Sequence, residues 1–316
     1  MKDAIAMADG NREKTAFVLA GGGSFGAIQV GMLRELVAHG VRPDLVVGAS
    51  VGSLNGIHFC CDPTPAGVAR LEAIWCGLRR SDVFPLSPRN LFGVFRGAAS
   101  LVDPSGLRGL VARHLPHSQL QDTVIPMHVA ATDLLTGASV LLSCGPAADA
   151  ILASCAIPGA FPPVRIGDQY LIDGAVASNT PVMAALALGC TRLVVLPTGF
   201  ACALSTPPTG ALASAFHALN LLVARQLVRD LEQLDGRVEV ATVPPLCPLA
   251  VSAYDFSRAR DLIERAAQGT RRWLEGGGLA QQRIPGALRP HVDEPQAGTP
   301  SGQPRSAGLS PVPSAP

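Results

Sequence analysis

Short hydrophobic runs alternate along the chain with longer segments in which hydrophobic residues recur every three or four positions. Residues 17–19 and 45–47 are apolar throughout, as is typical of strands buried on both faces of a parallel sheet. Between them, residues 27–39 carry their apolar side chains on one face of a predicted helix. This alternation predicts an α/β fold in three layers, with a mostly parallel central sheet covered by helices on both faces.

The same patterns continue beyond the first two strands. They predict a mostly helical middle at 61–120, a strand pair at 127–132 and 139–142, a buried strand at 193–196, and helices at 211–234 and 258–274. We expect one α/β domain over 15–280, preceded by a loose N-terminus at 1–14. The segment 285–316 is rich in Gly, Pro and Ser with almost no core-forming residues, which predicts a disordered tail.

Composition narrows the function classes. The 25 Lys and Arg residues nearly balance the 24 Asp and Glu residues, which argues against the basic surface of a nucleic-acid-binding protein. Charged residues make up 16% of the chain, against about 25% in an average soluble protein, and hydrophobic residues 48%, so we expect a large core. The eight cysteines form no CxxC pair, which favours reduced, buried thiols over a zinc site or a disulfide framework.

The sequence predicts neither a secretory signal nor a membrane span. Residues 1–14 lack an apolar signal-peptide core. The longest apolar stretches, 186–204 and 211–228, are interrupted by polar and charged residues and do not resemble a membrane span. We therefore expect a cytoplasmic protein, and this expectation is compatible with peripheral contact with a membrane.

A glycine turn follows the first predicted strand and has two interpretations. Gly21, Gly23 and Gly26 fit the GxGxxG pattern of dinucleotide-binding proteins, which makes NAD-type binding one alternative. The ribose-binding acid of such a site lies at the carboxyl end of the second strand, whereas Asp44 precedes that strand. In the other interpretation, the backbone N–H groups of Gly21, Gly22 and Gly23 form an oxyanion hole beside a helix N-terminus.

The second strand ends in a GxSxG sequence. Ser50 lies between Gly48 and Gly52, on a strand-to-helix turn that is typical of a nucleophilic serine. Such a serine needs a base. None of the seven histidines follows a late strand, where a triad histidine is expected.

A carboxylate offers the alternative base. Asp173 follows a short predicted strand and precedes Gly174 and Ala175. An apolar surrounding would raise the pKa of this carboxyl and make it a better base. Asp-Gly is also a common turn sequence, so this pair alone does not identify a catalytic group.

Together these motifs resemble the patatin-like phospholipase family. The likeness runs from about residue 15 to 196 and includes the glycine turn, the GxSxG sequence, the Asp173-Gly174-Ala175 segment and the stretches 153–163 and 179–181. The resemblance implies that Ser50 is the nucleophile, that Asp173 is the base of a Ser–Asp dyad, and that the Gly21–Gly23 backbone is the oxyanion hole. It implies no metal and no cofactor.

The resemblance also implies a lipid or acyl-ester substrate. Many family members carry Arg or Lys where this chain has Phe25, which favours general lipid esterase activity over phospholipase activity. The phenylalanines in 83–86 and 91–95 are either core residues or the lining of an acyl groove. A non-catalytic lipid-binding protein with the same fold is a further alternative.

Overall fold

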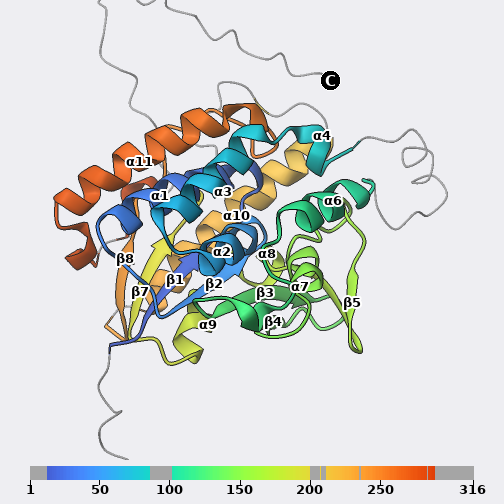
Figure 1. The fold of residues 1–316 in the computed structure, drawn as a ribbon, viewed down its shortest axis with the longest axis horizontal. Helices are drawn as coiled ribbons and strands as arrows, with labels where there is room; N and C mark the ends of the chain where they lie inside the picture. Colours follow the sequence, from blue (N-terminus) through green and yellow to red (C-terminus); the bar gives the residue numbers. More distant parts are fainter. Residues whose placement is uncertain are drawn as a thin grey trace, which may run out of the picture.

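The computed structural model describes residues 13–85, 102–199, 207, 211–234, 236–282 and 284–288. Within these ranges, an eight-stranded sheet forms the centre of the molecule (Figure 1). The strands are β1 (Thr15–Leu19), β2 (Leu45–Ala49), β3 (Met127–Asp133), β4 (Ser139–Leu142), β5 (Val164–Ile166), β6 (Gln169–Asp173), β7 (Arg192–Leu196) and β8 (Glu239–Thr242). The helices are α1 (Gly26–Ala38), α2 (Val51–Cys61), α3 (Pro65–Gly77), α4 (Arg80–Val83), α6 (Ser105–His114), α7 (Ala147–Ser154), α8 (Ala175–Ser178), α9 (Val182–Ala187), α10 (Ala211–Gln233) and α11 (Ala259–Glu275).

The strands follow the order β5-β6-β3-β2-β1-β7-β8, and β4 also pairs with β3. The neighbouring strands β3, β2, β1, β7 and β8 run parallel to one another. The other three strands, β4, β5 and β6, join the sheet by antiparallel pairing. The mostly parallel sheet that the sequence predicts is therefore confirmed, and so is the strand pair β3–β4.

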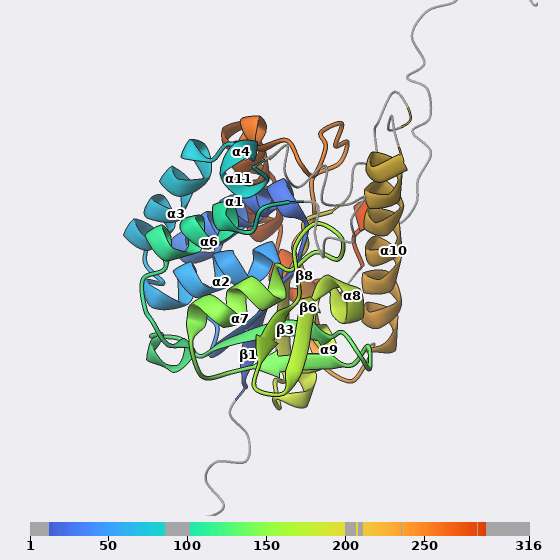
Figure 2. The ribbon, with the colours of Figure 1, turned by 90° about the vertical axis from the view of Figure 1, so that its right-hand side faces the viewer.

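Helices cover both faces of the sheet, as expected. On β1, Phe17 and Leu19 face a core shared with α1, α2, α3 and α11. Ala16 and Val18 face the opposite core, which contains residues of α9 and α10. Figure 2 shows α10 and α3 on opposite sides of the sheet. Because successive side chains of a strand point to opposite faces, an all-apolar run serves two cores at once.

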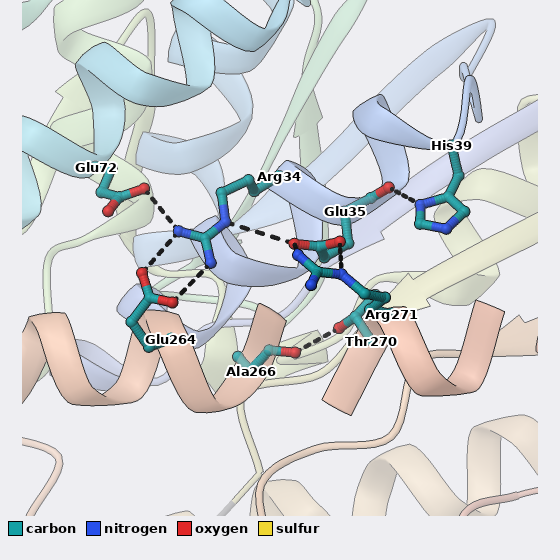
Figure 3. Close-up of polar contacts among 8 residues, drawn as sticks. All are labelled: Arg34, Glu35, His39, Glu72, Glu264, Ala266, Thr270 and Arg271. Atoms are coloured by element: carbon teal, nitrogen blue, oxygen red, sulfur yellow. Dashed lines mark hydrogen bonds and ion pairs between the residues drawn. The ribbon is translucent and has the colours of Figure 1, made fainter. Parts of the chain in front are cut away.

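Charged residues tie α1 to the helices around it (Figure 3). Arg34 forms two hydrogen bonds to Glu264 of α11, at 2.9 and 3.0 Å, and one to Glu72 of α3. Glu35 is almost fully buried and accepts two hydrogen bonds of 3.0 Å from Arg271. A buried carboxylate without a partner would destabilise the fold, so this pair offsets the desolvation of Glu35.

The register of β6 brings a distant residue to the end of β2. Of the seven residues of β3, only the last three pair with β6, and this register places Asp173 opposite Ala131. Ala130 in turn lies opposite Ala49, the residue before Ser50. Asp173 therefore lies level with Ser50, although 123 positions separate them in the chain.

Three expectations concern residues outside the described ranges. They are the loose N-terminus up to residue 12, the phenylalanines at 91–95, and the tail from residue 289 onward. In the ranges that the structure does describe, no helix combines the length and the apolar character needed to cross a membrane.

Candidate active site

Ser50 occupies a strained turn between β2 and α2. Its φ and ψ are 52° and −126°, and it is the only non-glycine residue with a positive φ in the described part of the chain. The turn is tight: a Cβ on Gly48 would lie 2.6 Å from the carbonyl oxygen of Gly52, and a Cβ on Gly52 would collide with the carbonyl oxygen of Leu19. Strain of this kind persists only where the surrounding structure enforces it, and it is common at catalytic residues.

The Ser50 hydroxyl points at Asp173. Its Oγ donates a hydrogen bond of 2.8 Å to Oδ2 of Asp173. The other carboxyl oxygen, Oδ1, accepts one of 2.8 Å from the backbone N–H of Ala175. Asp173 is only 3% exposed, and burial raises its pKa from 3.8 to about 6, although these two hydrogen bonds act in the opposite direction. The carboxyl is thus a stronger base than an exposed aspartate and is still ionised at neutral pH.

A second serine holds the backbone of this turn. The N–H of Ser50 donates a hydrogen bond of 2.8 Å to Oγ of Ser154, which itself donates to the carbonyl oxygen of Ala130 at 2.6 Å. Ser154 lies at the end of α7 and is fully buried. The turn is therefore fixed from α7 as well as from its own glycines. Ser154 belongs to the stretch 153–163 that resembles the family, but the sequence alone assigned it no role.

The glycine turn lies directly beside Ser50. Within it, Gly21 donates its N–H to the carbonyl oxygen of Asn179 at 2.9 Å, so that N–H is already engaged. The N–H groups of Gly22 and Gly23 have no acceptor among the described residues. All three glycines were predicted to offer an N–H to an oxyanion, whereas only those of Gly22 and Gly23 are open to one.

Two polar side chains fix this turn. Thr198 Oγ1 donates a hydrogen bond of 2.6 Å to the carbonyl oxygen of Gly21, and Asn179 Nδ2 donates a longer one of 3.4 Å to the same atom. A Cβ on Gly22 would collide with Thr198, so only glycine fits there. Thr198 follows β7, and sequence reasoning missed it. Asn179 belonged to a segment already noted, but without a role.

Two cavities meet at Ser50. One, called here the polar cavity, spans about 530 Å³ including its opening to solvent, and has Asp173, Asn179 and Tyr254 in its wall. The other, called the apolar cavity, spans about 490 Å³ including its opening to solvent, and is lined mainly by aliphatic and aromatic side chains. Ser50 thus stands between a partly polar space and an apolar one.

Aromatic rings form one wall of the apolar cavity. Phe84 stacks on Phe161 with ring centroids 5.5 Å apart and meets the edge of Tyr254 at 5.7 Å. The sequence left open whether Phe84 belongs to the core or lines a groove. Phe84 packs against the core and also lines the apolar cavity. Burial and the charge of Asp173 raise the pKa of Tyr254, so its hydroxyl stays protonated.

Other residues singled out in the sequence lie elsewhere. Asp44 lies at the amino end of β2, where its Oδ2 accepts a hydrogen bond from the N–H of Thr15. It is therefore remote from the glycine turn, as its position before the strand predicted. Phe25 is buried in the core. No histidine in the described ranges lines either cavity at Ser50, and His217 lies on α10.

Gly26, Gly174 and Ala175 all lie close to Ser50. Gly26 begins α1, and a Cβ on it would collide with Val51 beside the serine. Gly174 and Ala175 follow β6, and a Cβ on Gly174 would collide with the carbonyl oxygen of Ala130. These small residues allow the elements around the site to approach closely.

The chain was compared with known proteins. The patatin-like phospholipase family model matches residues 17–186. Patatin-like phospholipase domain-containing protein 7 of Rattus norvegicus is 24% identical over 186 residues, which are 58% of this chain and 13% of the relative. An uncharacterised NTE family protein of Mycobacterium tuberculosis is 30% identical over 168 residues, 52% of this chain and 27% of the relative. The chain thus spans less than a third of the length of these relatives.

Among solved structures, VipD from Legionella pneumophila resembles this one with a TM-score of 0.45 and 14% sequence identity, over 84% of this chain and 67% of VipD. The family model carries more weight, since it covers more than half of the chain and contains both the GxSxG turn and the Asp173 segment. On this basis, the chain belongs to the patatin-like phospholipase family.

Proposed function

We propose that this protein is a serine acyl hydrolase that cleaves carboxylic ester bonds of lipids through a Ser50–Asp173 dyad. The observation that carries the proposal is the hydrogen bond of 2.8 Å from the Ser50 hydroxyl to a buried carboxylate. Membership of the patatin-like phospholipase family supports a lipid as the substrate. The contact between nucleophile and base follows the general geometry of nucleophilic catalysis.

The reaction runs in two steps. Ser50 Oγ attacks the ester carbonyl carbon while Asp173 takes the hydroxyl proton, and the carbonyl oxygen becomes an oxyanion facing the N–H groups of Gly22 and Gly23. The C–O bond to the alcohol then breaks, and Asp173 returns the proton to the departing alkoxide. A water molecule then attacks the acyl-enzyme while Asp173 takes its proton. The bond between the acyl carbon and Ser50 Oγ breaks, Asp173 returns the proton to Oγ, and the fatty acid leaves.

The two cavities suit the two halves of an ester. The apolar cavity accommodates the hydrocarbon chain, since burying methylene groups there is favourable. The polar cavity, with Asn179 and Tyr254 in its wall, accommodates the alcohol. Asp173 lines the polar cavity and so faces the departing oxygen.

The proposal is tested by removing the hydroxyl of Ser50. Ser50→Ala should lower hydrolysis of p-nitrophenyl octanoate by roughly 10⁴-fold or more, while circular dichroism remains that of the parent. A fluorophosphonate probe should label the parent at Ser50 and leave Ser50→Ala unlabelled. Ser105→Ala, which removes an exposed hydroxyl at the start of α6, is the matched control and should retain both properties.

The same experiment separates the alternatives. A non-catalytic lipid-binding protein would not react with the probe. If Ser50→Ala turned over the ester at a near-normal rate, the proposal would be wrong. The dinucleotide alternative lacks its ribose-binding acid, because Asp44 lies at the amino end of β2, the opposite end of the strands from the glycine turn. Micromolar binding of NAD(H) in calorimetry would revive it.

A further inference from the structure

The apolar cavity at Ser50 adjoins a second cavity between the helices of the same layer. This second cavity, called here the inner cavity, spans about 410 Å³ including its opening to solvent, and is bordered by α2, α3 and α6. Leu54, Trp75, Leu78 and Leu110 line both cavities. These four side chains, called here the neck, separate the two spaces and are shared by them.

Helix α2 runs alongside both cavities. Ser50 is its N-cap, and Leu54 and His58 follow at intervals of four residues, which places the three on one face of the helix. Ser50 and Leu54 line the apolar cavity, whereas Leu54 and His58 line the inner one. With a rise of 1.5 Å per residue, Leu54 lies roughly 6 Å and His58 roughly 12 Å along the axis from Ser50.

One side of the neck is held firmly. Trp75 Nε1 donates a hydrogen bond of 2.8 Å to Oδ1 of Asn55, whose Nδ2 donates one of 2.9 Å to Oε1 of Gln29. Gln29 in turn donates to the carbonyl oxygen of Ala20, next to the glycine turn, at 2.8 Å. This buried chain fixes the indole. Leu54, another residue of the neck, is only half-buried and takes no part in this chain of hydrogen bonds.

Two histidines, His58 and His114, line the inner cavity, and His58 is the lining residue of α2 that lies farthest from Ser50. Burial, and to a lesser extent the proximity of His114, lowers the pKa of His58 to about 4, so this ring is uncharged at neutral pH. Apart from Asn55, the remaining wall is aliphatic or aromatic. The end of the cavity is therefore compatible with the methyl terminus of a hydrocarbon.

We propose that the two cavities form a single acyl site in two chambers, in which the carbon chain of the ester extends from Ser50 past Leu54 to His58. The distance of roughly 12 Å along α2 then corresponds to an extended chain of roughly ten carbons. Leu54 decides whether the chain enters the inner chamber. This inference rests on the proposed hydrolase function and adds the acyl length to it.

The first experiment measures kcat/KM for p-nitrophenyl esters with even-numbered acyl chains from butanoyl to hexadecanoyl. Each methylene buried in the site should raise kcat/KM about fourfold, the equivalent of about 0.8 kcal/mol, until the chain reaches His58. We expect a maximum near decanoyl. Leu54→Phe narrows the neck and should lower the decanoyl-to-butanoyl ratio at least tenfold, with a new maximum near hexanoyl.

Leu152→Ala provides the control, because Leu152 is a half-buried leucine packed against the same core and lines neither cavity. It should keep the ratio of the parent. A Leu54→Phe enzyme that still hydrolyses esters with the parental chain-length profile would overturn the inference.

The second experiment does not require hydrolysis. The chain contains two tryptophans, so in a Trp273→Phe, Ser50→Ala background Trp75 is the only one left. Bound 10-bromodecanoic acid should quench its fluorescence by contact with the indole, and adding Leu54→Phe should weaken this binding at least tenfold. Quenching that Leu54→Phe weakens, without ester hydrolysis in the parent, would refute the proposed function and keep the two-chamber site. Hydrolysis without quenching, or quenching that Leu54→Phe leaves unchanged, would refute the two-chamber site alone.

Discussion

Replacing Asp173 by Asn should abolish hydrolysis and at the same time stabilise the fold. The carboxyl is buried, and burial raises its pKa to about 6. The folded protein therefore disfavours the ionised form that we assign to catalysis. Asparagine has the same shape: its carbonyl oxygen can still accept from the N–H of Ala175, and its amide can donate to Ser50 Oγ.

The size of the effect follows from the pKa. A rise from 3.8 to about 6 is slightly more than two units, which corresponds to about 3 kcal/mol when each unit is worth 1.36 kcal/mol. Below pH 3.8 the carboxyl is protonated in both states, and ionisation has no effect on stability. As the pH rises from 3.8 to about 6, the unfolded chain loses its proton first, so the parent becomes less stable. Above about 6 the full destabilisation is present.

The assay is urea unfolding of parent and Asp173→Asn at a series of pH values from about 4 to about 8. The variant should match the parent near pH 4 and exceed its free energy of unfolding by about 3 kcal/mol near pH 8. Asp168→Asn is the control, since Asp168 is fully exposed in the β5–β6 turn and should follow the parent. A difference between Asp173→Asn and parent that does not change with pH would refute this reasoning.

Three further predictions concern activity and packing. The kcat/KM of the parent should fall about tenfold per pH unit below about 6 and level off above it, because protonated Asp173 cannot act as base; a pH-stat assay with activity unchanged down to pH 5 would contradict this. Glu35→Gln weakens the two hydrogen bonds from Arg271 and should lower the free energy of unfolding by about 1 kcal/mol in urea. Gly109→Ala adds a methyl group to α6 that meets no atom within 4 Å, and it should stabilise the fold by up to about 1 kcal/mol. Gly52→Ala places a methyl group against a carbonyl oxygen of β1 and should lower the melting temperature sharply. The reverse order of the two melting temperatures in thermal unfolding would disprove the packing argument.

Much of the fold could be predicted from local patterns. The runs at 17–19 and 45–47 are apolar at every position, and only strands with helices on both faces bury both sides of such a run. The helix predicted at 258–274 lies within one residue of α11 at each end. Hydrophobic spacing determines these elements because it reflects which side of each segment is buried.

The nucleophile turn was also visible in the sequence. Gly48 and Gly52 leave room for the close approach of strand and helix around Ser50, and this approach depends on residues within one short segment. The identity of the base was less clear, because an Asp-Gly pair has an ordinary meaning as a turn. It was the resemblance to a family that assigned a role to Asp173.

Long-range pairing decided the rest. No local pattern states that β6 joins β3 in antiparallel fashion at its last three residues, yet this register brings Asp173 to Ser50. Thr198 and Ser154 similarly reach the site from β7 and α7, and the Gly21 N–H is engaged by Asn179 from across the sheet. The chain alone therefore determined which segments become strands, helices and sharp turns, since those depend on neighbouring residues. Only the tertiary structure decided which groups meet at the site and which hydrogen bonds are left open, since these depend on the order and register of the strands.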